Sequence, residues 1–236
     1  MNITQLLEFA RGPLFRLCFA IMLLGLARIF FIDIWSAYKA FKKTDDKKMP
    51  WKLIINRSWE WIFPVKRLSN NFQFYSVLSI LFHIGLIIVP IFLFAHIQLW
   101  KESVGISWIS LPYRWAFWLT ISTIVFSISL ITGRIIIKQA RALSKKQDYF
   151  WLILLLIPFV TGFICANLNI SPQSYQFFML VHILSGELIF ILIPFSKIAH
   201  CVLAPLSQVV STLAWKFPPD TNDDICTTLN KKGAPV

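Results

Sequence analysis

Five apolar stretches, each about as long as a lipid bilayer is thick, dominate this chain of 236 residues. A hydrocarbon core of about 30 Å takes roughly 20 helical residues to cross. Each stretch is bounded by charged residues, prolines or clusters of Asn and Ser, so each predicts a separate membrane span. The predicted spans cover residues 13–35, 72–99, 113–137, 149–168 and 175–203. The sequence therefore predicts an all-α, polytopic five-helix bundle, with a membrane domain over residues 1–205 and a polar tail over residues 206–236.

The composition agrees with this class of protein. Apolar residues make up 57% of the chain and charged residues only 14%, whereas soluble domains carry about a quarter charged residues. These fractions exclude a disordered chain and a collagen-like fibre. The four cysteines form no C-x-x-C pair, so the sequence predicts no disulfide framework, zinc motif or covalent haem attachment.

Basic residues are concentrated in two of the four loops. The loop between the first and second spans holds Lys39, Lys42, Lys43, Lys47, Lys48, Lys52, Arg57, Lys66 and Arg67. The loop between the third and fourth spans holds or borders Arg134, Lys138, Arg141, Lys145 and Lys146. The loop between the second and third spans holds or borders only two basic residues, Lys101 and Arg114, and the loop between the fourth and fifth spans holds no basic residue. Because basic loops stay on the cytoplasmic side, we expect the N-terminus outside and the C-terminus in the cytoplasm. The net charge of +12 is assigned to this topology and not to nucleic-acid binding.

The segment between the first two spans, PWKLIINRSWEWIFPVKRL, combines tryptophans with basic side chains. Trp51, Trp59 and Trp61 among Lys and Arg are typical of a helix that lies in the membrane interface. A docking surface for a cytoplasmic partner is the alternative, and one segment can serve both purposes.

All four histidines lie within predicted spans, His83 and His96 in the second and His182 and His200 in the fifth. An imidazole is disfavoured in hydrocarbon, and ionisable residues inside a membrane face the bundle interior, where they usually have a function. Their position therefore predicts that the histidines are ligands.

The spacing of the histidines predicts two pairs. On a continuous helix, His182 and His200 would share a face about 27 Å apart, and His83 and His96 would lie roughly 20 Å apart. Because the two spans run in opposite directions, His83 is expected at the depth of His200, and His96 at the depth of His182. Two such pairs suit two haems with an imidazole on each side of the iron, an arrangement for electron transfer. A step of 13 residues leaves the two rings of the second span about 140° apart on an ideal helix, unless Pro90 kinks or unwinds it.

Other readings of the histidines remain open. A histidine in a span can be a hydrogen-bonding core residue, and a proton relay usually includes buried acids, of which the fifth span offers only Glu187. A tetrahedral zinc site does not fit pairs that lie so far apart. The competing class of protein is a haem-free membrane anchor or transporter subunit, although the internal repeats of many transporters are not evident.

The stretch LVHILSGELIFILIPFSKIAHCVLAPLS resembles the last helix of the gamma subunit of respiratory nitrate reductase. That family has a histidine, an apolar helix, then P-F-S, a basic residue and a second histidine, which here are His182, residues 194–197 and His200. FHIG at residues 82–85 resembles the other ligand helix of the family. The sequence GRIIIKQARALS at residues 133–144, with the long spacing in the second span, is more similar to relatives of that family. These are the membrane cytochromes of sulfur-metabolism complexes (the Dsr complex M subunit) and of heterodisulfide-reductase-like assemblies.

The resemblance implies a membrane cytochrome b subunit of a respiratory complex with two non-covalent b haems. His83 and His200 would hold the inner haem, and His96 and His182 the outer one. Such a subunit carries electrons between the quinone pool and a cytoplasmic iron–sulfur subunit, in a bacterial or archaeal cytoplasmic membrane. The chain has neither the cysteine sets for iron–sulfur clusters nor a nucleotide motif, so we do not expect a complete enzyme.

Four further residues are candidates for contacts with the cofactors. The guanidinium of Arg134 suits the propionates of the inner haem, with a positive-inside anchor as the alternative. Lys101 and Arg114 flank the outer loop and suit propionates of the outer haem or a quinone carbonyl. Glu187, about one turn after His182, is a candidate acceptor of protons from quinol near the outer haem.

Overall fold

The computed structural model describes residues 2–43, 51–62 and 73–201, together with residues 203, 207, 227, 228 and 230. All regular structure in this part of the chain is helical. Five helices are long and apolar enough to cross a membrane: Ile3–Lys42, Tyr75–Phe92, Tyr113–Ile136, Lys146–Asn167 and Pro172–Phe195. The prediction of an all-α chain with five apolar helices is confirmed. The predicted tail, 206–236, lies outside the described residues except at the four positions given above.

The chain divides into two compact units. The first consists of Met1–Met22 and Arg67–Leu192, and the second of Leu23–Lys66 and Ile193–Val236. His83, His96 and His182 therefore belong to the first unit, and His200 belongs to the second.

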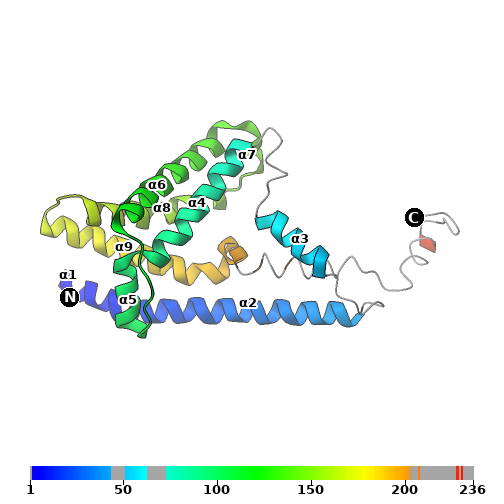
Figure 1. The fold of residues 1–236 in the computed structure, drawn as a ribbon, viewed down its shortest axis with the longest axis horizontal. Helices are drawn as coiled ribbons and strands as arrows, with labels where there is room; N and C mark the ends of the chain where they lie inside the picture. Colours follow the sequence, from blue (N-terminus) through cyan, green and yellow to red (C-terminus); the bar gives the residue numbers. More distant parts are fainter. Residues whose placement is uncertain are drawn as a thin grey trace. The chain divides into compact units, whose positions relative to one another are not determined.

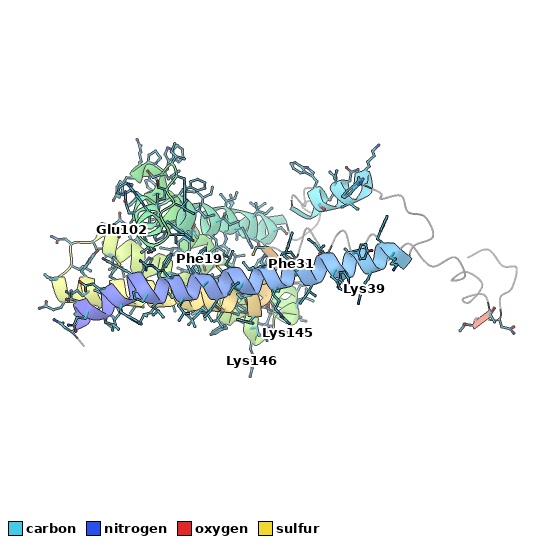
Figure 2. The ribbon with its side chains drawn as sticks, turned by 90° about the horizontal axis from the view of Figure 1, so that it is seen from below. Phe19, Phe31, Lys39, Glu102, Lys145 and Lys146 are labelled. Atoms are coloured by element: carbon cyan, nitrogen blue, oxygen red, sulfur yellow. The ribbon has the colours of Figure 1, made fainter. Side chains whose placement is uncertain are left out.

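The first apolar helix starts earlier than the sequence predicted. It consists of α1 (Ile3–Phe9), a π-helical turn η1 (Ala10–Leu14) and α2 (Phe15–Lys43). The first span was predicted to begin at Pro13. In the structure, Pro13 lies inside the π-helical turn, so the helix is already formed before this proline. Helix α2 exposes large apolar side chains such as Leu24 and Phe31, which are 70% and 67% exposed; Figure 2 labels Phe31 on this helix. Such a surface suits lipid.

The segment after the first apolar helix forms α3 (Trp51–Ile62). Trp51, Ile55 and Trp59 are exposed, and their spacing of four residues places them in one row along the helix. Ile54 is buried. A helix with an exposed aromatic and aliphatic row agrees with the predicted amphipathic character, and its place in the membrane interface stays a prediction.

The second predicted span, 72–99, is not one helix. It divides into α4 (Gln73–Phe92) and α5 (Phe94–Val104), because Leu93 between them has an extended backbone. The helix that can cross a membrane ends at Phe92, so His96 lies on a different helix from His83. The geometry expected for these two histidines on one continuous helix is therefore wrong.

The helices of the first unit pack in chain order (Figure 1). Helix α4 contacts α6 (Tyr113–Ile136), α6 contacts α8 (Lys146–Asn167), and α8 contacts α9 (Pro172–Leu192). The short helix α7 (Lys138–Leu143) lies between α6 and α8 in the sequence. Phe82, Leu130 and Leu152 form a buried cluster that joins α4, α6 and α8.

Helices α4 and α6 approach each other closely at Gly85. A Cβ atom added there would overlap the hydroxyl of Thr123, and it would lie 3.1 Å from the Thr123 Cβ. Thr123 is 1% exposed, and its hydroxyl donates to the carbonyl of Leu119 at 2.6 Å. A small residue at such a contact allows two membrane helices to pack backbone to backbone.

Replacing Gly85 by alanine should therefore destabilise the protein. Overpacking of this kind costs about 1–3 kcal/mol, which thermal unfolding in detergent would detect as a lower Tm. The second-site change Thr123→Ala removes the overlapping hydroxyl and should restore part of the loss. Gly12→Ala is the control, because a Cβ at Gly12 would meet no atom within 4 Å. Equal melting temperatures for Gly85→Ala and wild type would contradict this account of the contact.

The fifth predicted span, 175–203, also ends earlier than expected. Helix α9 ends at Leu192, and two 3-10 turns follow, η3 (Ile193–Phe195) and η4 (Lys197–Ala199). Pro194 has no N–H group and disfavours a helix before it, and Ser196 is extended. His200 follows η4 and does not lie on α9, so the prediction of five continuous helical turns between His182 and His200 is wrong.

Candidate functional site: a pair of histidines

The imidazole rings of His96 and His182 face each other within the first unit. Their centroids lie 5.8 Å apart, and their planes differ by 17°. His96 is the third residue of α5, and His182 lies in the middle of α9. Two residues that are far apart in the sequence thus meet in a parallel arrangement, which agrees with the depth predicted for them.

The helix interruption at Leu93 positions His96. In an uninterrupted helix, the carbonyls of the three residues before Leu93 would accept hydrogen bonds from the amides of residues 94–96. Other groups donate to these carbonyls instead. The carbonyl of Pro90 accepts from the His96 imidazole at 2.9 Å, and that of Ile91 accepts from the Trp108 indole at 2.9 Å. The carbonyl of Phe92 accepts from the amide of Leu111 at 2.8 Å. Every carbonyl freed by the interruption is therefore satisfied, as buried backbone groups require. The imidazole of His96 is itself one of the groups that stabilise the break.

His182 is held against α8. Its Nδ1 lies 2.8 Å from the carbonyl oxygen of Pro158, and its ring lies directly over Gly162. A Cβ added at Gly162 would lie 2.8 Å from Cε1 and 2.9 Å from Nδ1 of His182, which is closer than real contacts allow. Glycine at this position therefore permits the ring to reach the backbone of α8.

All four histidines share one hydrogen-bonding pattern, in which Nδ1 approaches a backbone carbonyl. The Nδ1 of His83 lies 2.6 Å from the oxygen of Ser79, and that of His200 lies 2.7 Å from the oxygen of Lys197. Because a carbonyl only accepts, Nδ1 must carry the hydrogen, and the lone pair is then on Nε2. Histidines that bind metals almost always donate their other ring N–H in this way.

His96 is also neutral under ordinary conditions. It lies in α5, outside the five helices long enough to span a membrane. Burial, together with the nearby ring of His182, lowers the pKa of His96 to about 4. A neutral imidazole is the form that binds a metal.

The chain leaves room next to His182. Gly186 follows it by four residues and therefore lies on the same side of α9. A Cβ added at Gly186 would meet no atom within 4 Å. Beside it, Ser185 is buried, and its hydroxyl donates to the His182 carbonyl at 3.0 Å. The side of α9 that carries His182 thus has open space one turn along the helix.

Clusters of three or more His, Cys, Asp or Glu side chains suited to a metal ion are absent from the described part of the chain. A metal bound here would need ligands from outside the protein as well. A pair of imidazoles does not make a tetrahedral zinc site, whereas a haem iron needs only two axial ligands beyond its macrocycle.

Arg134 lies at the end of α6, as expected, among polar groups from α4, α8 and the residue that follows α7. Its Nη1 donates to the Ser144 hydroxyl at 2.9 Å, and its carbonyl accepts from the Tyr149 hydroxyl at 3.0 Å. Its guanidinium carbon lies 5.9 Å from the centre of the Tyr75 ring. The Nε of Arg134 and the hydroxyl of Tyr75 are buried and have no hydrogen-bond partner among the described residues. Both are donors that an anionic group would satisfy.

The remaining three candidates, Lys101, Arg114 and Glu187, differ in their exposure to solvent. Lys101 in the last turn of α5 and Arg114 in the first turn of α6 have exposed side chains. Glu187 on α9 is only 4% exposed, and neither of its carboxyl oxygens has a hydrogen-bond partner in the described part of the chain. Glu187 is therefore the candidate whose surroundings differ most from an ordinary surface residue.

A cluster of aromatic rings next to the histidine pair was not predicted. Trp100 stands four residues after His96, and its ring meets the rings of Phe15 and Phe19 edge to face, with centroids 5.5 and 4.7 Å apart. Phe15 in turn lies 6.1 Å from Phe190 of α9. The spacing of four residues between Phe15 and Phe19 was a signal available in the sequence. Their contact with α5 was not, because it depends on the interruption at Leu93.

Comparisons with known proteins give one relative. No family model matches the chain, and no solved structure matches it. A curated protein of Nitratidesulfovibrio vulgaris (strain Hildenborough) is 36% identical to the chain over 155 residues, which are 65% of this chain and 67% of the relative. The name of that relative states no activity or ligand. The chain belongs to the same family as this Nitratidesulfovibrio vulgaris protein.

Proposed function

We propose that this chain is the membrane cytochrome b subunit of a respiratory redox complex. It carries electrons across the bilayer between the quinone pool and an iron–sulfur partner subunit. One b haem is bound by His96 and His182, and a second by His83 and His200. The observation that carries the proposal is the pair of facing rings of His96 and His182, each fixed through Nδ1 to a backbone carbonyl.

The surroundings of this pair fit a haem. A haem iron with two neutral imidazole ligands supplies one-electron transfer. The carbonyls of Pro90 and Pro158 orient the two rings, and Gly162 allows the His182 ring to sit against α8. The open space at Gly186 gives room for a macrocycle beside the ligand.

Polar groups elsewhere in the chain suit the propionates of the haems. The buried Nε of Arg134 and hydroxyl of Tyr75 have no hydrogen-bond partner among the described residues, and Tyr75 lies eight residues before His83 on α4. We assign this cluster to a propionate of the haem at His83. Lys101 and Arg114 remain candidates for propionates of the other haem or for a quinone carbonyl.

The distribution of charge supports the proposed topology. The basic segments around residues 39–67 and 134–146 would lie on the cytoplasmic side of a bacterial or archaeal cytoplasmic membrane. The N-terminus would lie outside and the C-terminus inside. An iron–sulfur subunit would dock on this basic face, close to the haem at His83 and His200.

A reduced-minus-oxidised absorption spectrum of the purified chain tests the proposal. We expect a b-type alpha band and, in the pyridine haemochrome assay, about two haems per chain, because each six-coordinate iron uses two of the four histidines. Expression with a haem precursor supplement would ensure that supply does not limit the content. A haem content near zero under these conditions would contradict the proposal and favour a haem-free anchor or transporter subunit.

A further inference from the structure

Glu187 is the only buried acidic side chain in the described part of the chain. It is 4% exposed, whereas Glu8 and Glu102 are exposed and Asp33 and Asp148 are half-buried. Neither carboxyl oxygen has a hydrogen-bond partner among the described residues. A polar group buried in this way costs free energy unless something else satisfies it.

The side of α9 that carries Glu187 faces the N-terminal helix. Helix α9 contacts both α1 and η1, and the buried thiol of Cys18 is close enough to interact electrostatically with the carboxyl group of Glu187. Phe15, one turn before Cys18, meets Phe190, one turn after Glu187, with ring centroids 6.1 Å apart. Glu187 therefore stands at the edge of the aromatic cluster.

The same cluster adjoins the histidine pair. Trp100 packs on Phe15 and Phe19, and it follows His96 by one helical turn on the same side of α5. Phe190, one turn after Glu187 on α9, contacts Phe15, and Phe15 contacts Trp100 on the helix that carries His96. All of these residues belong to the first unit.

This combination of groups has a specific chemical use. Aromatic side chains offer flat apolar surfaces to a planar ring, and ligand sites pair such surfaces with a few polar groups that fix orientation. A carboxyl group accepts a hydrogen bond when ionised and donates one when protonated. These are the two bonds that a quinol hydroxyl and a quinone carbonyl require.

We propose that Glu187 hydrogen-bonds an oxygen of a quinone or quinol headgroup held beside the aromatic cluster of Phe15, Phe19, Trp100 and Phe190. The inference rests on the proposed function, which supplies the quinone, and it identifies the side of the protein where the quinone binds. The headgroup would lie near the haem bound by His96 and His182. The carboxyl oxygens would then gain the partner that they lack.

Equilibrium binding of a radiolabelled short-chain naphthoquinone to the full chain in lipid nanodiscs tests the proposal, with binding to empty nanodiscs subtracted. Glu187→Leu removes both oxygens and should raise the Kd about tenfold or more, because a buried hydrogen bond is lost. Glu187→Gln keeps the shape and one donor, so a smaller increase is expected. Glu102→Gln, which changes an exposed acid on α5 (Figure 2), should bind as wild type.

An infrared difference spectrum gives a second readout that needs no electron transfer. Adding quinone should shift the carboxyl C=O stretching band of the wild-type protein, and the shift should be missing in Glu187→Gln. If Glu187→Leu does not fold, Glu187→Gln and this band decide the question. Wild-type affinity in a folded Glu187→Leu protein, or an unchanged band shift in Glu187→Gln, would overturn the inference.

The haem content of the same samples separates this inference from the proposed function. If the protein holds two haems per chain and its quinone affinity does not depend on Glu187, the inference is overturned but the proposed function is not. Quinone binding that depends on Glu187 in a protein without haem would support the inference while overturning the cytochrome assignment.

Discussion

Replacing His182 by alanine should leave the purified protein with about one haem per chain instead of two. Under the proposed function, the change would remove one of the two histidines that hold a haem, and a haem that is not covalently attached would depend on both of them. His96 would remain tied to Pro90, but it would face an empty position. The pyridine haemochrome assay would measure the content, and a redox titration of the alpha band should show one wave where the wild type shows two.

A double-mutant cycle with His96 tests whether the two histidines hold the same haem. His96→Ala should remove the same haem, so the double variant should lose no more than either single variant, as expected for residues that act as a unit. Leu184→Ala controls for truncation on α9, because Leu184 is exposed on another side of that helix. Two haems in His182→Ala, or different haems lost in the two single variants, would show that these histidines do not share an iron.

The sequence predicted the number and approximate positions of the apolar helices because hydropathy over about 20 residues reports directly on burial in lipid. It predicted the C-terminal ends of the third and fourth helices within one residue, but it did not predict where the first, second and fifth helices end. Pro194 and the extended Ser196 stop α9 before His200, although the residues around them are apolar enough to continue the span. The break at Leu93 is similar, because it depends on Trp108 and Leu111, which lie beyond the helix and supply donors to its last carbonyls.

The candidate site contains the residues that the sequence predicted, but the geometry that brings them together is different. The pairing of His96 with His182 was predicted from depth on two continuous helices, and His96 in fact lies on the separate helix α5. Its ring reaches His182 because the new helix starts there, which removes the 140° problem of an unbroken helix. An acid within a span is expected to face the bundle interior, but nothing in the local sequence shows that the N-terminal helix covers the side of α9 that carries Glu187.

Gly186→Leu should remove the haem at His96 and His182 while leaving the protein without haem as stable as before. In the structure, a Cβ at this position would meet no atom within 4 Å, so the new side chain enters open space in the apoprotein. We therefore expect its free energy of unfolding to change by no more than about 0.5 kcal/mol. If a macrocycle occupies the space beside His182, the leucine overlaps it, and the haem content should fall toward one per chain. Thermal unfolding of protein made under haem limitation and the haemochrome assay of supplemented protein measure the two effects.

The experiment compares the stability of the protein without haem with the haem content of supplemented protein. A substitution that simply damages α9 would lower the stability of the apoprotein as well, and Gly162→Leu should behave in that way because its side chain overlaps the His182 ring. Leu188→Phe adds bulk at an exposed position of the same helix and should change neither quantity. If Gly186→Leu keeps two haems, the space next to Gly186 faces lipid, and the macrocycle must approach His182 from the other side of the ring.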